Sequence, residues 1–444
     1  MLLFKRIFDN RSNTTNMKRR TFFKYTVLPA LLSGFKLNAL AGSPFMQNLL
    51  GSSTNGRVLV VIQLAGGNDG LNTVIPIEFY PAYKNARPNI AIDETKILKL
   101  NGHDATGLNP SMGLMQQLFN EDKLAIIQAV SYPKPSFSHF RATDIWLTGE
   151  DSDQNLNTGW MGGYLNKLYP DFPNHFPNSI TPHPLAIQIG SVVSSAFQGP
   201  AFPMAMAISN PDSFYKMLNE NHIDAATSVS QEQIDYVREI AEKTDAYSDV
   251  IKLAAKKITK QSNKYPAKGK NSLADQLQIV SRLIAGGLPT KIYMVSMGGF
   301  DTHANQTDAG DTSRGNHANL LQKISEAIDA FMDDLKLQNT EDRVVGMTFS
   351  EFGRRIKSNA SGGTDHGVGA PVFIFGKPVN SGIIGTNPIL PEAATDKDNI
   401  MMQTDFRAVY STLLKNWLGA KDEEMPNILM NNFTSLPIIK NAFA

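Results

Sequence analysis

The chain has 444 residues, 42% hydrophobic and 19% charged, which is enough for a large core in one α/β domain or in two smaller domains. It contains no cysteine, which excludes disulfides, thiolate metal sites and a thiol nucleophile. The formal charge is +1, but residues 1–41 contain eight Lys/Arg and one acidic residue, so the remainder is mildly acidic, which argues against nucleic-acid binding.

The first 41 residues have the features of an export signal. Lys18–Lys24 (KRRTFFK) carries the paired arginines of a twin-arginine signal, an apolar stretch covers Tyr25–Leu40, and Ala39–Ala41 has the small-x-small pattern of a cleavage site. An amphipathic N-terminal helix is the alternative interpretation. The pattern predicts recognition by the twin-arginine export machinery and a periplasmic or otherwise exported mature protein. No apolar run reaches 18 residues, so no membrane span is expected in that protein.

The rest of the chain alternates between expected strands and helices. Apolar, β-branched runs predict strands at Arg57–Ala65, Leu124–Val130, Ile187–Ile189, Met204–Ile208, Lys291–Ser296, Val344–Phe349 and Pro371–Phe375. Helical spacing predicts helices near 137–149, 320–335 and 405–417, and a more polar helical insertion or cap at about 210–285. This order predicts one α/β domain over residues 42–444, with a mostly parallel central sheet and helices on both faces.

Polar side chains stand at the ends of these strands, where ligands collect in parallel α/β sheets. The residues after strand ends are Asp69, Ser136, Ser138, His139, Asp301, His303, Ser350 and Glu351, and His366 comes just before the last strand. Any one of them is also typical of a turn or a helix cap. Taken together, oxygen and imidazole groups without sulfur favour a site for Zn²⁺, Mn²⁺, Mg²⁺ or Ca²⁺. A Ser hydroxyl activated by such a metal is a nucleophile.

Five motifs together resemble the domain-of-unknown-function 1501 family, whose members are similar to the alkaline phosphatase superfamily. They are GGNDGLNT (66–73), SFSHF (136–140) with IWLTG (145–149), GGFDTH (298–303), TFSEFGRR (348–355) and GGTDHG (362–367), and the resemblance covers about residues 57–420. It implies an alkaline-phosphatase-like fold. It also implies hydrolysis of anionic phosphate or sulfate esters, with a Ser nucleophile and one or two divalent metals.

The same resemblance implies ligands for two metal sites. One consists of Asp301, His303 and His366, and the other includes Asp69 and Glu351. Zn²⁺ or Mn²⁺ is the expected metal, with Ca²⁺ or Mg²⁺ as alternatives. The second site lacks the histidine that the superfamily usually supplies, which leaves one metal, a weak second metal or loss of catalysis as the alternatives.

Three residues are implied to be catalytic. The segment before the helix at 137–149 places Ser136 at the nucleophile position, and Ser138 is an alternative because the match is short. His139 can replace the missing histidine.

Three further residues are candidates for binding the substrate. Arg354 and Arg355, expected on one early helix, suit a phosphate or sulfate oxygen, or else form a solvated face or an ion pair. Asn72 either contacts substrate or orders its own turn. Asp365 is expected to orient His366 or the turn around it.

A different class of function fits the same motifs. A binding or assembly protein that kept the fold and lost turnover is favoured by the missing histidine. A role on sulfated or phosphorylated glycans is a third hypothesis, which only scattered aromatic residues support. The remaining histidines are interpreted as surface or structural residues: His103, His175, His183, His222 and His317.

Overall fold

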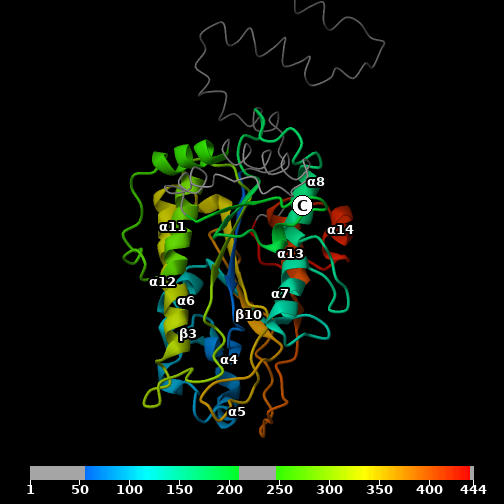
Figure 1. Ribbon diagram of the computed structural model, residues 1–444. Helices are drawn as coiled ribbons and strands as arrows, with labels where there is room; N and C mark the ends of the chain where they lie inside the picture. Colours follow the sequence, from blue (N-terminus) through cyan, green and yellow to red (C-terminus); the bar gives the residue numbers. More distant parts are fainter. Residues whose placement is uncertain (1–55, 210–246, 441–444) are drawn as a thin grey trace, which may run out of the picture. The chain divides into compact units, whose positions relative to one another are not determined.

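A computed structural model describes residues 56–209 and 247–440, which are built around one large β-sheet (Figure 1). In these residues the sheet has nine strands in the order β11-β5-β10-β9-β1-β8-β6-β7, with β12 paired to β5. The strands are β1 (Val58–Leu64), β5 (Leu124–Ser131), β6 (Ala186–Ile189), β7 (Met206–Ile208), β8 (Ile292–Met297), β9 (Val344–Phe349), β10 (Ala370–Phe375), β11 (Gly382–Ile384) and β12 (Thr404–Asp405). The mixed, mostly parallel α/β class expected from the sequence is confirmed.

Helices cover both faces of this sheet (Figure 1). One face is covered by α6 (Gly113–Asn120), α11 (Ser272–Ala285) and α12 (Asn316–Leu337), and the other by α7 (His139–Thr148), α8 (Trp160–Leu168), α13 (Phe406–Thr412) and α14 (Met425–Leu429). The period-2 alternation of a strand explains the two cores. In β1, Val58, Val60 and Ile62 pack in the first core, whereas Leu59 and Val61 pack in the second.

A smaller antiparallel sheet and several short helices complete the described part. The sheet has the order β2-β4-β3, from β2 (Val74–Pro76), β4 (His103–Leu108) and β3 (Leu98–Leu100). The short helices are α4 (Gly70–Thr73), α5 (Tyr80–Ala86), the 3-10 turns η1 (Ile77–Phe79), η2 (Glu94–Lys96), η3 (Pro110–Met112), η4 (Ser195–Phe197), η5 (Glu341–Arg343) and η7 (Asp422–Glu424), and the π-helical turn η6 (Leu413–Trp417).

Two predicted segments fall partly or wholly outside the described residues. The export signal at 1–41 lies outside them, as does the part of the predicted insertion between 210 and 246. The remainder of that insertion includes α11, which packs against α12, β6 and β8 and so belongs to the helical layer of the sheet. Among the helices that are described, none has the length and apolar character to cross a membrane.

The direction of β10 decides which loops meet. Among the described strands of the large sheet, β10 alone runs against the others, because it is antiparallel to both β5 and β9 and the remaining pairs are parallel. Ala370, its first residue, therefore pairs with Val130 near the end of β5. The loop that enters β10 thus lies at the same edge as the carboxyl ends of β1, β5, β8 and β9.

The segment between β9 and β10 is a loop, so the early helix predicted after Glu351 is wrong. A β-bridge between Arg354 and His366 and the bond from Gly353 N to Val368 O fold this segment back on itself. The local sequence does not show this long-range pairing, which replaces helical hydrogen bonds.

A buried ion pair fixes the turn after β1. Arg87 Nη1 lies 2.6 Å from Asp69 Oδ2 and 2.8 Å from Oδ1, and both side chains are fully buried. Arg87 also donates to the carbonyl of Ile356, and Gln306 Nε2 donates to Asp69 Oδ2 at 2.6 Å. Burial opposes ionisation of Asp69, but the charge and hydrogen bonds of Arg87, the charge of His317 and the hydrogen bond from Gln306 together outweigh it and hold the pKa of Asp69 below its ordinary value. The pair joins this turn to the loops after β8 and β9.

Replacing Arg87 by Met is expected to lower the free energy of unfolding by about 3–5 kcal/mol, because it leaves the Asp69 carboxylate buried without its cation. Urea unfolding monitored by circular dichroism measures the change. Lys96→Met is the matched control, since it removes a half-exposed pair with Asp311 and should cost under about 1 kcal/mol. Equal losses in the two variants would contradict a structural role for the buried pair.

Candidate metal centre

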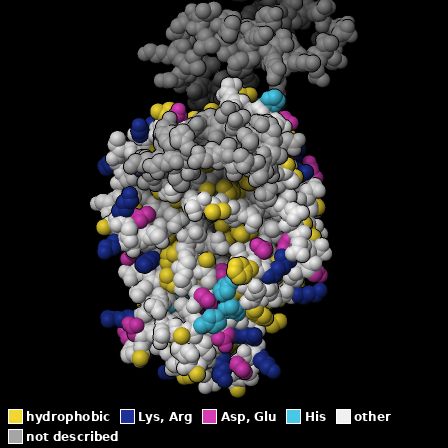
Figure 2. Space-filling view, in the orientation of Figure 1, with side chains coloured by type: hydrophobic (Ala, Val, Ile, Leu, Met, Phe, Trp, Pro, Cys, Tyr) yellow, Lys and Arg dark blue, Asp and Glu magenta, His cyan; other side chains and the backbone are white. Residues whose placement is uncertain are grey.

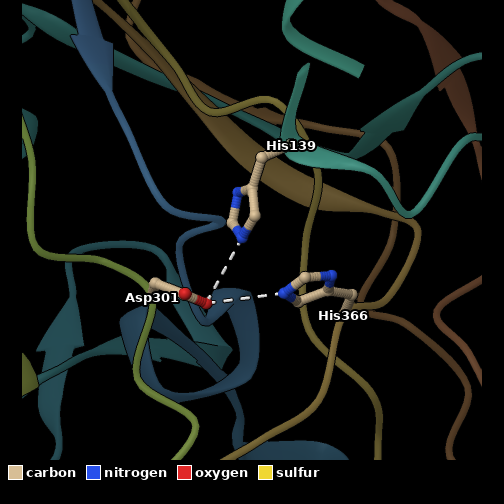
Figure 3. A group of neighbouring side chains, drawn as sticks. All are labelled: His139, Asp301 and His366. Carbon is tan, nitrogen blue, oxygen red and sulfur yellow. Dashed lines mark ion pairs between the residues drawn. The ribbon is translucent and has the colours of Figure 1, made fainter. Parts of the chain in front are cut away.

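Four side chains from three loops meet at this edge of the sheet. His139 is the first residue of α7, Asp301 and His303 follow β8, and His366 lies before β10. Asp301 Oδ1 is 3.5 Å from His139 Nε2, 3.2 Å from His303 Nε2 and 3.4 Å from His366 Nε2. Figure 3 shows His139 and His366 pointing at this oxygen, and the ligand atoms of these three residues lie within 4.8 Å of one another.

Each of the three imidazoles presents its Nδ1 to an oxygen that can only accept a hydrogen bond. The pairs are His139 with Glu351 Oε1 at 2.8 Å, His303 with Asp365 Oδ1 at 3.2 Å, and His366 with the Phe137 carbonyl at 2.8 Å. Each Nδ1 therefore carries a hydrogen, and each neutral ring has its lone pair on Nε2. Burial lowers the pKa of His366, which favours its neutral form.

These tautomers bring electron pairs together. His303 Nε2 and His366 Nε2 are 2.8 Å apart, and both face the Asp301 carboxylate. Two lone pairs cannot form a hydrogen bond with each other, so this contact requires positive charge, which either a proton on one Nε2 or a bound metal ion supplies. Imidazole nitrogens and carboxylate oxygens are both among the usual ligands of Zn²⁺. An oxygen acceptor behind each imidazole is also typical of metal sites, where it fixes the ring and strengthens the ligand.

Arg354 holds Asp301 from the protein side. Its Nη2 lies 2.7 Å from Asp301 Oδ1, and its side chain is fully buried. The same guanidinium donates to four main-chain carbonyls, those of Gly66, Gly67, Phe300 and Thr364. Partial burial opposes ionisation of Asp301, but the hydrogen bond and charge of Arg354 lower its pKa overall. Of the roles predicted for Arg354, the structure shows the ion pair, because its side chain is fully buried against Asp301.

Glu351 and Asp365 stand behind the histidines. Glu351 is 2% exposed, and its Oε1 accepts hydrogen bonds from Gly66 N at 2.8 Å and from His139. The sequence predicts Glu351 as a direct ligand, whereas the structure makes it the partner of His139. Of the two roles expected for Asp365, the structure shows the one in the turn: Asp365 Oδ1 accepts from Asn359 Nδ2 at 3.2 Å, and it contacts His303 and not the adjacent His366.

The second predicted metal site does not form from the described residues. Asp69, its other expected ligand, has both carboxylate oxygens bound by Arg87, and Gln306 binds one of them as well. Asn72 is fully buried, where it donates to the Ile90 carbonyl and accepts from Arg87, so it orders its own turn and is not placed to contact substrate. A long-range ion pair thus takes Asp69 out of the ligand set.

Two glycines of the GGTDHG motif allow the loops to approach. A Cβ at Gly363 would lie 2.4 Å from the His303 carbonyl carbon, and one at Gly367 would lie 2.3 Å from the Arg354 carbonyl carbon. Real Cβ contacts are never so short, so these positions require glycine. The motif therefore places His366 and packs its backbone against the other loops of the centre.

The two candidate nucleophiles lie at the start of α7. Ser136 is partly exposed and Ser138 is exposed. Ser138 N donates to Ser136 Oγ at 3.3 Å, and the Ser138 hydroxyl makes no capping hydrogen bond. Phe137, between them, accepts the bond from His366, which brings this segment against the centre.

Arg355 lies beside the same segment. Its guanidinium is 5.1 Å from the centre of the Phe137 ring, and its Nη1 donates to the Lys397 carbonyl at 2.6 Å. Its predicted contact with substrate stays a prediction.

Some functional relationships have no sequence signal. The Phe137 carbonyl orients His366, and Arg87 binds Asp69. Both contacts join residues that are distant in the sequence. The sequence does identify His139 as a site residue. It follows a predicted strand at the edge of the sheet where the site is expected, and it is one of few histidines in the motifs.

The chain belongs to the family described as protein of unknown function (DUF1501), whose model matches residues 104–420 and so confirms the predicted family. No curated protein matches the chain. Three similar solved structures are bacterial. An alkaline phosphatase superfamily protein from Vibrio parahaemolyticus is 12% identical, with 85% of this chain and 71% of that chain covered and a TM-score of 0.34.

The other two are a sulfatase and a periplasmic domain by their names. The PsFucS1 sulfatase from Pseudoalteromonas sp. is 11% identical, with coverage of 90% and 75% and a TM-score of 0.38. The C-terminal periplasmic domain of EcEptC from Escherichia coli, solved in complex with Zn, is 9% identical, with coverage of 73% and 74% and a TM-score of 0.34. These likenesses are too distant to assign an activity, so a functional proposal depends on the geometry of the centre.

The centre is expected to bind one Zn²⁺ per chain, measured by competition with a chromogenic chelator. His139→Ala and Asp301→Ala each remove a ligand and should weaken binding most. Glu351→Gln keeps His139 as a ligand but weakens the hydrogen bond that orients its ring, and it should lower the affinity for Zn²⁺ by about 10–100-fold. His175→Ala, at an exposed position, is the control and should bind like the unaltered chain. The same affinity in all four variants would exclude these residues as the metal site.

Proposed function

We propose that this chain is an exported metal-dependent hydrolase of phosphate or sulfate esters, with one divalent ion held by His139, Asp301, His303 and His366. The observation that carries the proposal is the convergence of three imidazole Nε2 atoms on Asp301 Oδ1. Three nitrogen donors favour Zn²⁺ over Mn²⁺, Ca²⁺ or Mg²⁺, which prefer oxygen ligands.

Charge explains why an anionic substrate needs the ion. The carboxylates of Asp301, Glu351 and Asp365 contact the histidines, and the guanidinium of Arg354 offsets one of them. The centre alone is therefore negative and repels an anion, whereas a divalent ion neutralises it. The N-terminus of α7 adds positive partial charge, and its first turn contains no acidic residue.

When bound, such an ion polarises an ester oxygen and favours ionisation of a nearby hydroxyl. Ser136 would supply that hydroxyl, because the amide of Ser138 holds its Oγ and the Phe137 carbonyl ties the segment to His366. Its Oγ would attack phosphorus or sulfur, and the ester oxygen would leave as the alcohol after taking a proton. Water would then hydrolyse the seryl ester and regenerate Ser136. Arg355, beside Phe137, would add positive charge toward the anion.

The protein purified with Zn²⁺ or Mn²⁺ is expected to hydrolyse at least one member of a panel of aryl phosphate, phosphodiester and aryl sulfate substrates. Ser136→Ala and His366→Ala should each lower kcat by about 10³-fold or more, because they remove the nucleophile and a ligand. Ser138→Ala shows whether Ser136 or Ser138 is the nucleophile. Ser179→Ala, on an exposed loop, is the control. Unchanged turnover in Ser136→Ala, Ser138→Ala and His366→Ala would refute the mechanism.

Export rests on the sequence of residues 1–41. Arg19→Lys combined with Arg20→Lys is expected to leave the chain inside the cell, because the paired arginines are the feature that the twin-arginine machinery recognises. Immunoblots of periplasmic and cytoplasmic fractions measure the distribution. Lys5→Ala with Arg6→Ala, which alters two other N-terminal cations, should not change it. Normal export of the double-lysine variant would exclude this route.

One observation favours a second candidate, a binding or assembly protein without turnover. The hydrogen bond to Ser136 Oγ comes from an amide donor, and the carboxylates predicted for a second metal bind Arg87 and His139 instead. A serine without a second metal or a base has weaker activation. This candidate predicts metal binding and metal-dependent binding of phosphonates, with no hydrolysis of any substrate in the panel.

A further inference from the structure

Two exposed phenylalanines flank His139. Phe140 is 87% exposed and Phe137 is 39% exposed, although Phe belongs to the residues most often buried. One follows His139 directly and the other precedes it by two positions. Figure 2 shows hydrophobic side chains beside a group of histidine side chains on this face. Contiguous exposed apolar surface bordered by polar residues is a feature of ligand-binding sites.

Both phenylalanines belong to the segment that supplies His139 to the centre. The carbonyl of Phe137 accepts the hydrogen bond from His366 Nδ1 at 2.8 Å, and the guanidinium of Arg355 covers its ring. Phe140 is the second residue of α7, and the Cα–Cβ bonds of a helix tilt toward its N-terminus. Its side chain therefore leans toward the helix end where His139 meets Asp301.

The chemistry of an ester connects these two surfaces. A single bridging oxygen joins the anionic group to its alcohol part, so an ester with its anion at the centre must place the alcohol part on the bordering surface. The hydroxyl-bearing side of that border is Ser136 and Ser138, and the apolar side is Phe137 and Phe140. An aromatic group can stack on an exposed phenylalanine ring in an offset or edge-to-face arrangement.

We propose that Phe137 and Phe140 form an aromatic rim that selects phosphate or sulfate esters of aromatic alcohols. This inference rests on the proposed function for the anionic half of the substrate and adds the class of the other half. The rim acts by contact with the leaving group, so it changes affinity for that group and not the binding of the metal.

The test measures binding of analogues that cannot be hydrolysed, so the ease of leaving-group departure plays no part. Isothermal titration calorimetry compares benzylphosphonate with methylphosphonate, and benzylsulfonate with methanesulfonate, on the Zn²⁺-loaded protein. The benzyl member of the phosphonate or the sulfonate pair is expected to bind about 10-fold more tightly than the methyl member, because the ring leaves water. Binding of the phosphonates indicates a phosphate ester as the substrate, and binding of the sulfonates indicates a sulfate ester.

Variants assign the preference to the rim. Phe140→Ser should reduce the benzyl preference to about 3-fold or less and leave binding of the methyl analogue unchanged, and Phe137→Ser should reduce the same preference. Ile180→Ser is the matched control, because Ile180 is 88% exposed on the loop between α8 and β6. It should keep the full preference.

Several outcomes would overturn the aromatic rim. Equal binding of benzyl and methyl analogues, with both lost on chelation, would reject the rim and leave the proposed anion site standing. Hexylphosphonate binding as tightly as benzylphosphonate would reject the choice of aromatic alcohols, as would a preference that survives in both Phe variants. Absence of all binding to the Zn²⁺-loaded protein would reject the rim and the proposed function together.

Discussion

The buried guanidinium of Arg354 holds together the loops from which the metal centre is made. It donates to carbonyls of the turn after β1, the loop after β8 and the loop before β10, and it also binds the Asp301 carboxylate. A buried charge is tolerated because all of these oxygens replace its water, and a planar fork of five N–H groups is needed to reach so many at once. Lysine has neither the number nor the geometry of donors. The loops contain little regular structure, so the relative positions of the three that Arg354 contacts depend on this side chain together with the Arg87–Asp69 pair.

Strand direction is the second constraint, and it marks the limit of what the sequence predicts. The bounds of β1, β5 and β9 follow closely from their apolar runs, because a buried strand must be apolar on both faces. Nothing in Pro371–Phe375 indicates that this strand runs against its neighbours. In a fully parallel sheet, His366 would enter at the edge opposite Asp301 and His303. The sequence predicts that Asp301, His303 and His366 lie together, and the reversed direction of β10 makes this arrangement possible.

Some candidate ligands can be identified from local sequence motifs, whereas the roles of others depend on contacts with residues far away in the sequence. Asp301, His303 and His366 were identifiable because a chemical motif sits at each strand end. Asp69 met the same criterion, yet its carboxylate is taken by Arg87, which comes from the end of another helix. Glu351 was likewise placed at the right edge, but its role depends on which ring it faces. His139 then supplies a third imidazole from α7 beside Asp301, so the histidine that is missing after β9 comes from a different element.

The short segment 136–140 carries several tasks at once. It supplies the candidate nucleophile, the backbone carbonyl that fixes His366, the ligand His139 and the exposed Phe140. Because these groups share one turn of backbone, any movement of the N-terminus of α7 changes the metal geometry and the surface for the alcohol together. Loops that carry a single function can vary in conformation without such consequences, whereas here the metal-binding histidines and the hydroxyl must keep a fixed relation. The hydrogen bond from His366 to Phe137 is the contact that maintains this relation, since it joins the β10 loop to the α7 segment directly.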